Sequence, residues 1–160
     1  MYYLTMKDKG KLGFSLIELL VAVIILGILA MVGLASFSSS QRKARDAVRK
    51  HDLTEVQKAI EMYSADHGVY PLLDLSWGNE FNDAPVHQET LYMKQLPKDP
   101  LSDQLYCYRT PDEGDSYQLY ANLENTNDPA KIPTVSCGGR DYNFGVSSPN
   151  IDPEDINPEE

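Results

Sequence analysis

The chain has few of the residues from which catalytic sites are built. Its three histidines, His51, His67 and His87, are scattered, and no HExxH or CxxC pairing accompanies them. The sequence also lacks a G-x-S-x-G nucleophile turn and a GxxxxGK[ST] phosphate loop. A membrane-anchored enzyme is therefore the least supported candidate function, because no catalytic constellation is present.

Basic residues are scarce. Lysine and arginine together number 14 against 24 aspartates and glutamates, so the formal net charge is −10. Removal of residues 1–13, which hold three lysines and one aspartate, would leave 11 basic and 23 acidic residues and a net charge of −12. A chain this acidic is repelled by phosphate backbones, so we expect no nucleic-acid partner.

The first proline is Pro71, and the chain before it contains a long segment without charge. Leu19–Phe37 holds 19 residues with neither a charged side chain nor a proline. As a helix it would cover about 28 Å, close to the thickness of a bilayer's hydrocarbon core. Glu18 stands at the start of this segment, where a carboxylate costs at least ~2.5 kcal/mol and indicates a functional site.

The residues around Glu18 resemble a known family. Gly13-Phe14-Ser15-Leu16-Ile17-Glu18, followed by LLVAVIILGILA, is similar to the N-terminus of type IV pilins, a family that includes the type II secretion pseudopilins and the competence pilins. The resemblance implies that a prepilin peptidase cuts between Gly13 and Phe14 and methylates the new Phe14 amine. It also implies that Glu18 pairs with the Phe14 amine of a neighbouring subunit, which would neutralise two charges that are costly to bury alone.

Residues 1–13 are interpreted as the leader that this cleavage removes. One alternative is an ordinary secretory signal with Lys7–Lys11 as its basic start and cleavage before Ser36. It leaves Glu18 inside the apolar region unexplained. Another alternative is a plain single-pass anchor in which Glu18 lies near the headgroups by accident.

Two features depart from what the resemblance implies. Five basic residues follow the span and three precede it, which by the positive-inside rule favours an outside N-terminus, whereas a prepilin leader lies in the cytoplasm. We follow the resemblance, because its motif is more specific than a difference of two charges. The basic residues are Lys7, Lys9 and Lys11 before the span and Arg42, Lys43, Arg45, Arg49 and Lys50 after it.

Many relatives also carry a proline about 22 residues into the mature chain, where this sequence has Ala35.

The helix is predicted to continue from the span into water and to end at His67. Gly68 is a helix stop and Pro71 prevents resumption. Apolar or small residues recur near the helical period and predict a stripe that packs on a domain, namely Ala44, Val48, Val56, Ile60 and Tyr63. The opposite face is charged and predicted to be solvated, and it carries Arg45, Arg49, Asp52, Glu55, Lys58, Glu61 and Asp66.

The remaining chain predicts a small globular domain over residues 68–146 and an acidic, disordered tail over 147–160. Alternating large side chains predict strands at Leu105–Thr110 and Ser116–Leu123, with a hairpin loop at 112–115, and a third strand at Arg140–Val146. Leu91–Leu96 is expected to form one or two helical turns. The fold class is therefore α+β, a long helix, half of it transmembrane (14–40) and half soluble (41–67), packed on a small antiparallel sheet. Leu96-Pro97-Lys98-Asp99-Pro100 also resembles the LP-x-DP stretch of major pseudopilins.

Cys107 and Cys137 are the only cysteines, and outside the cytoplasm a disulfide between them is favoured over two thiols. Closing a loop of this length would stabilise the domain by roughly 3–4 kcal/mol. A C-terminal cystine loop also resembles what many type IV pilins have. The Glu124–Asp128 segment is rich in the oxygens that suit calcium, but its spacing matches no defined ligand pattern, so we expect a polar loop and no cofactor.

The sequence thus predicts a structural subunit of a type IV pilus or a type II secretion pseudopilus. The resemblance implies four partners: prepilin peptidase, identical and related subunits, an inner-membrane assembly machine with an ATPase, and the membrane. The subunit would span the inner membrane once with its C-terminal domain outside, and then enter an extracellular or periplasmic filament. The alternative is a minor pilin that binds a surface or takes up DNA, and the acidic charge argues against DNA.

Overall fold

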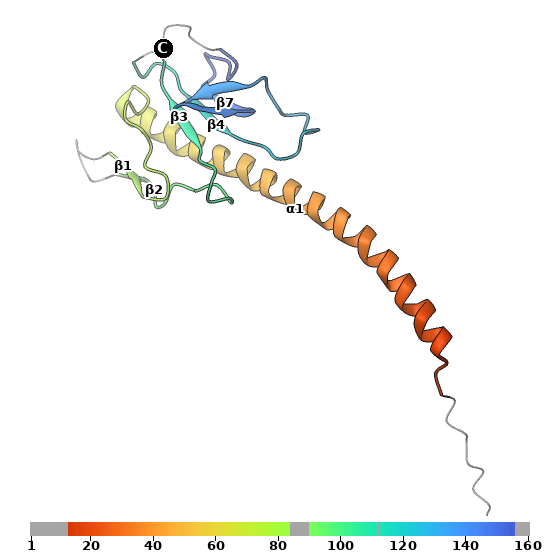
Figure 1. Cartoon of the computed structure of the whole chain (residues 1–160). Helices are drawn as coiled ribbons and strands as arrows, with labels where there is room; N and C mark the ends of the chain where they lie inside the picture. Colours follow the sequence, from red (N-terminus) through yellow and green to blue (C-terminus); the bar gives the residue numbers. More distant parts are fainter. Residues whose placement is uncertain (1–12, 84–89, 112, 156–160) are drawn as a thin grey trace, which may run out of the picture. The chain divides into compact units, whose positions relative to one another are not determined.

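The computed structural model describes residues 13–83, 90–111 and 113–155, with the backbone alone for 32–35. Helix α1 (Leu16–His67) is followed by strands β1 (Phe81–Asn82), β2 (Leu91–Met93), β3 (Cys107–Arg109), β4 (Gln118–Ala121), β5 (Val135–Cys137), β6 (Arg140–Tyr142) and β7 (Phe144–Ser147) (Figure 1). All strand pairs are antiparallel. The predicted α+β class is confirmed. Residues 1–12 of the predicted leader lie outside the described residues.

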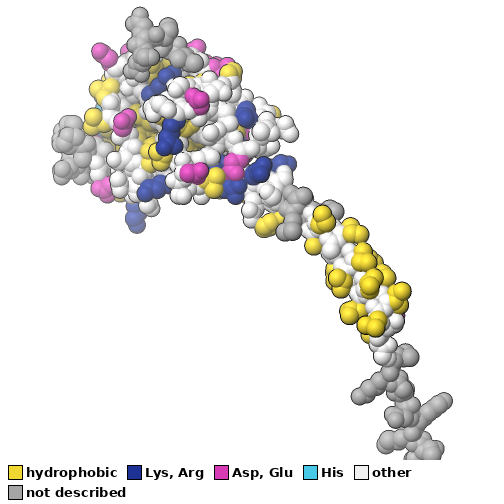
Figure 2. Space-filling model, in the orientation of Figure 1, with side chains coloured by type: hydrophobic (Ala, Val, Ile, Leu, Met, Phe, Trp, Pro, Cys, Tyr) yellow, Lys and Arg dark blue, Asp and Glu magenta, His cyan; other side chains and the backbone are white. Residues whose placement is uncertain are grey.

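The chain divides into two compact units, Met1–Ser39 and Ser40–Glu160, and helix α1 runs through both. In the first unit its described large apolar side chains are exposed, from 46% for Val21 to 87% for Leu16. This part contains the one described helical segment that is long and apolar enough to cross a membrane, and none of it is buried inside the protein. The space-filling view shows apolar side chains over the visible surface of this part of the helix (Figure 2).

The helix ends where the sequence predicted. Gly68 follows His67 with a φ of +77°, in the left-handed region that favours glycine, and its N–H donates to the Ser64 carbonyl (2.7 Å). Nothing lies within 4 Å of where a Cβ on Gly68 would stand, so backbone conformation alone selects glycine here.

The buried face of the soluble half differs from the prediction. Val56 and Ile60 are buried as expected, but Ala44 and Val48 are exposed. The stripe instead begins with Asp46 and Arg49, which are 1% and 0% exposed. Charged side chains can lie in a protein interior only when opposite charges and hydrogen bonds satisfy them. The prediction failed because it counted only apolar residues as buried.

The domain core lies between α1 and the three-stranded sheet β3–β4–β7. The register pairs Tyr108 of β3 with Leu119 of β4, and Leu119 with Val146 of β7. The core consists of buried side chains from the helix, the sheet and the intervening loops, among them Leu53, Val56, Ile60, Leu96, Tyr106, Tyr117, Leu119 and Phe144. Four tyrosines in or against this core donate hydroxyl hydrogen bonds to helix carboxylates, namely Tyr106 to Asp52, Tyr117 and Tyr70 to Glu61, and Tyr92 to Asp66.

Two strand predictions need correction. Leu91–Leu96 does not form helical turns, since Leu91–Met93 is β2, paired with β1. The expected single strand at Arg140–Val146 is two strands. β6 closes a hairpin with β5 through the Gly138–Gly139 turn, whose φ values are +57° and +74°, and β7 then joins β4. The Gly138-Gly139 pair between two short runs is a sequence signal for this hairpin, and the prediction did not use it.

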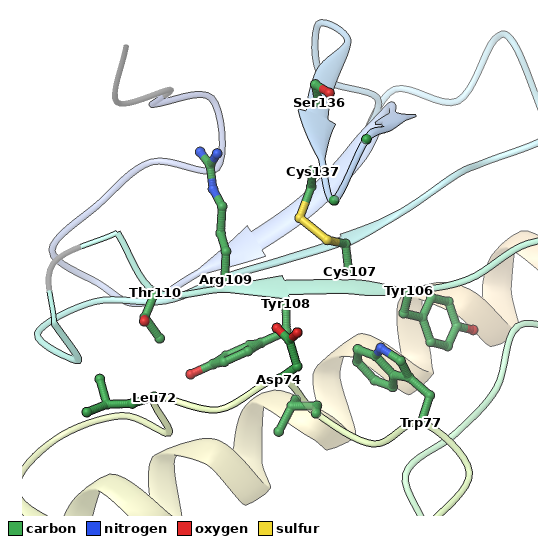
Figure 3. A pocket seen from close by; sticks show the side chains of 13 residues that line it. Leu72, Asp74, Trp77, Tyr106, Cys107, Tyr108, Arg109, Thr110, Ser136 and Cys137 are labelled. Atoms are coloured by element: carbon green, nitrogen blue, oxygen red, sulfur yellow. A yellow bond between two sulfur atoms is a disulfide. The ribbon is translucent and has the colours of Figure 1, made fainter. Parts of the chain in front are cut away.

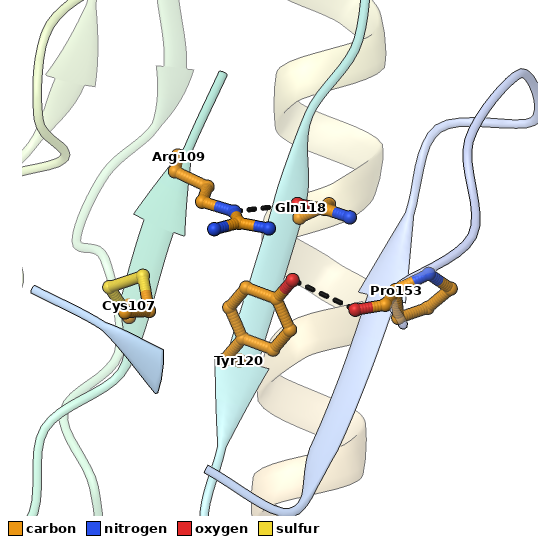
Figure 4. The surroundings of a disulfide bond; sticks show 6 residues. Cys107, Arg109, Gln118, Tyr120 and Pro153 are labelled. Atoms are coloured by element: carbon orange, nitrogen blue, oxygen red, sulfur yellow. Dashed lines mark hydrogen bonds between the residues drawn. A yellow bond between two sulfur atoms is a disulfide. The ribbon is translucent and has the colours of Figure 1, made fainter. Parts of the chain in front are cut away.

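The predicted disordered tail is also corrected for residues 147–155, while 156–160 lie outside the described residues. Ser147 belongs to β7, and the chain beyond it lies along the sheet. Tyr120 Oη donates to the Pro153 carbonyl (2.8 Å) (Figure 4). Gln118 Nε2 donates to the carbonyls of Asp152 (2.7 Å) and Asp155 (3.0 Å). Backbone carbonyls hold this segment, so its acidic composition gave no indication of order.

Candidate functional site

The N-terminal site contains the predicted residues Gly13, Phe14 and Glu18. Ser15 immediately precedes the first helical residue, and its N–H donates to Glu18 Oε2 (3.0 Å). This is the contact that a capping box makes when a glutamate three positions into a helix satisfies the N-cap amide. The S-x-x-E pattern at 15–18 is the sequence signal for it, and our sequence analysis did not use that signal.

Glu18 lies on an otherwise apolar face of the helix. Its neighbours on that face are Phe14, Ile17, Val21, Ala22 and Ile25. Phe14 is 78% exposed and Ile17 is 69% exposed, so nothing described in this chain covers the face. The geometry leaves the second carboxylate oxygen, Oε1, without a described hydrogen bond and available to a cation from outside the subunit.

A buried ionic cluster ties helix α1 to two distant loops of the domain. Arg49 donates to both carboxylate oxygens of Asp99 (2.7 and 2.9 Å), to Asp46 (2.8 Å) and to Glu124 (2.8 Å). Asp46 in turn accepts the backbone N–H groups of Glu124 (2.9 Å) and Asn125 (2.8 Å). The side chains of Arg49 and Asp99 are both fully buried. Asp99, which belongs to the stretch that resembles LP-x-DP, is thus an anchor for the helix.

The cluster shifts the pKa values of Glu124, Arg49 and Arg45. A hydrogen bond from Arg45, opposed by burial and supported by Arg49, lowers the pKa of Glu124 to about 2. Arg45 holds that carboxylate through two bonds of 2.7 and 2.6 Å. Burial opposes the charged form of Arg49, but its hydrogen bonds to Asp99, Glu124 and Asp46 raise its pKa on balance. Glu124, Arg45 and Arg49 are therefore charged at neutral pH.

The oxygen-rich loop at Glu124–Asp128 is held by cations of the protein itself. Glu124 is bound by Arg45 and Arg49, and Asp128 Oδ1 accepts from Lys50 Nζ (2.6 Å) and from the backbone N–H of Ala130 (3.0 Å). The hydrogen bond from Lys50 lowers the pKa of Asp128. Within the described residues, no three or more histidine, cysteine, aspartate or glutamate side chains are grouped to hold a metal ion.

Cys107 and Cys137 are joined by a disulfide in the structure, across 30 positions of sequence. The bond connects β3 to β5, and therefore attaches the β5–β6 hairpin to the main sheet (Figure 4). Beside it lies an open groove of about 750 Å³ along β3, with Trp77, Tyr108 and Gly138 among its lining residues (Figure 3). Tyr108 donates its hydroxyl to the Pro71 carbonyl (2.7 Å), and the groove contains no arrangement of catalytic groups.

Comparison with known proteins separates the chain into two matched parts. Residues 8–34 match the family model of the prokaryotic N-terminal methylation motif. Residues 36–129, more than half of the chain, match that of type II secretion system protein G. The chain belongs to the type II secretion system protein G family. The match ends before Cys137, so the hairpin attached by the disulfide lies outside it.

Individual relatives agree with this assignment. Type II secretion system core protein G of Vibrio cholerae is 31% identical over 119 residues, which cover 71% of this chain and 81% of the relative. The Pseudomonas aeruginosa protein of the same name is 33% identical over 122 residues, covering 72% and 85%. That of Escherichia coli K12 is 28% identical over 123 residues, covering 70% and 80%. No solved structure gives a significant match.

The family assignment confirms the predicted function at the level of a structural filament subunit with a prepilin-type N-terminus. The absence of a catalytic motif fits a family of structural subunits.

Proposed function

We propose that this subunit is cut between Gly13 and Phe14 by a prepilin peptidase, methylated on the Phe14 amine, and assembled into the pseudopilus of a type II secretion system. Before assembly it is held in the inner membrane by residues 14–40, with the domain on the periplasmic side. The observation that carries the proposal is the lone Glu18 carboxylate on the exposed apolar face of α1, five residues into the mature chain.

Assembly exchanges lipid for neighbouring helices around the apolar half of α1. Such an exchange gains little from the hydrophobic effect, because lipid tails are as apolar as the side chains that replace them. The register of the subunits must therefore come from close packing and from polar pairs. A cationic Phe14 amine from a neighbouring subunit would satisfy Glu18, and each charge would be costly without the other.

Three of the five basic residues after the span, Arg45, Arg49 and Lys50, form ion pairs with carboxylates of the domain. These pairs do not alter the positive-inside count, because acidic residues contribute little to it. The proposed orientation therefore rests on the prepilin-type N-terminus.

The intact mass and N-terminal sequence of the protein from its own membrane test the processing. A chain that begins at N-methylated Phe14 is the expected result. A chain that begins at Ser36 would mean an ordinary secreted protein, and an uncut Met1 would leave only a single-pass anchor. Either of these would overturn the proposal.

Replacement of Glu18 tests the assembly step. Glu18→Ala should abolish or strongly reduce filaments while the domain stays folded, because the pairing carboxylate is lost. Glu80→Ala, which removes an exposed carboxylate of the domain, is the matched control and should assemble normally. Normal filaments from Glu18→Ala, counted by electron microscopy at equal subunit abundance, would show that the carboxylate does not direct assembly.

A further inference from the structure

The basic segment after the apolar span separates into paired and unpaired side chains. Arg45, Arg49 and Lys50 each bind a carboxylate from the loops of the domain at 2.6–2.8 Å. Arg42 and Lys43 are exposed, and neither side chain forms an ion pair or a hydrogen bond with a described residue. The space-filling view shows Lys and Arg side chains gathered on the stretch of α1 where the domain begins (Figure 2). The domain's own carboxylates therefore leave two adjacent cations unused.

These two cations follow the apolar span closely in the sequence. Phe37 is the last residue of the uncharged segment, and Arg42 follows five residues later, after the polar residues 38–41. At the helical rise this separation is about 7.5 Å, similar to the thickness of one headgroup layer. Long basic side chains can also reach back toward the interface with their charged ends. Arg42 and Lys43 therefore fall at the level of the lipid phosphates when residues 14–37 span a bilayer.

The net negative charge of the chain opposes its contact with an anionic membrane surface, so two unpaired cations beside that surface matter. With 24 acidic and 14 basic residues, the protein as a whole is repelled by an anionic membrane surface. A cation beside the surface gains about 1 kcal/mol from anionic lipids, and the gain decays within a Debye length. Arg42 and Lys43 are placed to offset the repulsion where the chain leaves the membrane.

We propose that Arg42 and Lys43 form a binding site for the phosphate groups of anionic phospholipids in the leaflet on the domain side. The arginine guanidinium supplies paired N–H donors for phosphate oxygens, and the lysine ammonium adds a point charge. The site rests on the proposed membrane anchoring of the subunit. It holds the waiting subunit at a fixed depth, and its contacts must break when the subunit is extracted into the filament.

Lipid selectivity measured by electron spin resonance tests the site. The chain from Phe14 onward, which lacks the three lysines of the leader, is reconstituted in phosphatidylcholine bilayers that contain spin-labelled phosphatidylglycerol or spin-labelled phosphatidylcholine. The motionally restricted fraction of each label gives a relative association constant. We expect a value of about 2 or more in favour of phosphatidylglycerol for the unaltered chain, falling toward 1 in 1 M salt.

Two double variants make the result specific. Arg42→Gln/Lys43→Gln should lower the selectivity to near 1. Lys94→Gln/Lys98→Gln removes the same two charges from exposed positions of the domain and should keep it. Equal selectivity of the unaltered chain and the Arg42→Gln/Lys43→Gln variant would overturn the proposal. Loss of subunit contacts in lipid-free filaments, with selectivity unchanged, would assign these side chains to carboxylates of a neighbouring subunit instead.

A separate measurement distinguishes failure of this site from failure of the membrane anchor. A nitroxide on Val23→Cys reports oxygen and nickel-chelate accessibility in the same bilayers. High oxygen and low chelate accessibility show that the helix spans the membrane, so absent phosphatidylglycerol selectivity then counts against the lipid site alone. A water-exposed nitroxide would overturn the anchoring on which the site depends.

Discussion

Replacement of Arg49 by methionine is the sharpest test of how the domain is held on its helix. The substitution keeps much of the side-chain volume but removes four hydrogen bonds of 2.7–2.9 Å to three carboxylates. Breaking a buried ion pair by removing one partner costs about 3–5 kcal/mol, because the remaining charge stays buried without a counter-ion. We expect the free energy of unfolding to fall by that amount.

The structure identifies which carboxylate carries the cost. Glu124 keeps Arg45, and Asp46 keeps the backbone N–H groups of residues 124 and 125. Asp99 keeps only the N–H of Leu101 (2.8 Å) among the described hydrogen bonds, and its side chain is fully buried. Asp99→Asn should therefore recover part of the loss when combined with Arg49→Met, with a coupling energy on the order of 1–3 kcal/mol.

Urea unfolding of the full chain in detergent micelles provides the assay. Trp77 is the only tryptophan and contacts the Tyr106 ring (centroids 5.4 Å apart), so its fluorescence reports the domain. Arg42→Met removes an exposed arginine from the same helix and should change stability by about 0.5 kcal/mol or less. Two results would refute the reasoning that Asp99 is left as an uncompensated buried charge. One is a loss of less than about 1 kcal/mol in the free energy of unfolding for Arg49→Met. The other is that the free-energy changes of the substitutions at 49 and 99 simply add.

Three further predictions follow from the same contacts. Because the folded-state pKa of Glu124 is about 2 against an ordinary 4.5, its contribution to stability is complete above pH 4.5 and is lost as the pH falls toward 2. Arg45→Gln should raise this pKa, which NMR titration of the side-chain carboxyl carbon measures. An unchanged pKa would contradict the assignment of the shift to Arg45. Replacing Cys107 and Cys137 by serine should cost roughly 3–4 kcal/mol for a loop of 30 residues, measured by urea unfolding, whereas a negligible loss would mean that the hairpin is held by its packing alone. We propose that the loop at 124–128 needs no calcium, since Arg45, Arg49 and Lys50 already hold its carboxylates, so EDTA should leave the thermal midpoint unchanged and a clear decrease would argue for a bound cation.

Sequence reasoning succeeded where the determining interactions are local. The helix end depends on one glycine in a left-handed conformation, and Gly68 was found correctly. The strands β3 and β4 alternate large side chains and were found at their centres. The N-terminal motif is contiguous, so residues 13–18 could be selected without any knowledge of the fold.

It failed where partners are distant in the sequence. Arg49 meets Asp99 and Glu124 across 50 and 75 positions, and no local pattern shows that these charges are buried together. The predicted solvated face of the helix is for the same reason partly an interior face, on which Asp52 and Glu61 receive tyrosine hydroxyls. The ordered segment after β7 was missed because backbone carbonyls, which every residue has, are its main acceptors.

The two halves of α1 are consequently suited to different kinds of neighbour. The first half presents exposed apolar side chains and one carboxylate, none of which the described domain residues satisfy. In the second half, Arg49 is paired with Asp99 of the domain. Three helix carboxylates accept tyrosine hydroxyls of the domain, namely Asp52, Glu61 and Asp66. Exchange of lipid for neighbouring helices around the first half need not break any of these contacts. Substitutions at Glu18 should therefore change assembly without changing the unfolding of the domain, while Arg49→Met should lower domain stability before it affects the pairing of Glu18.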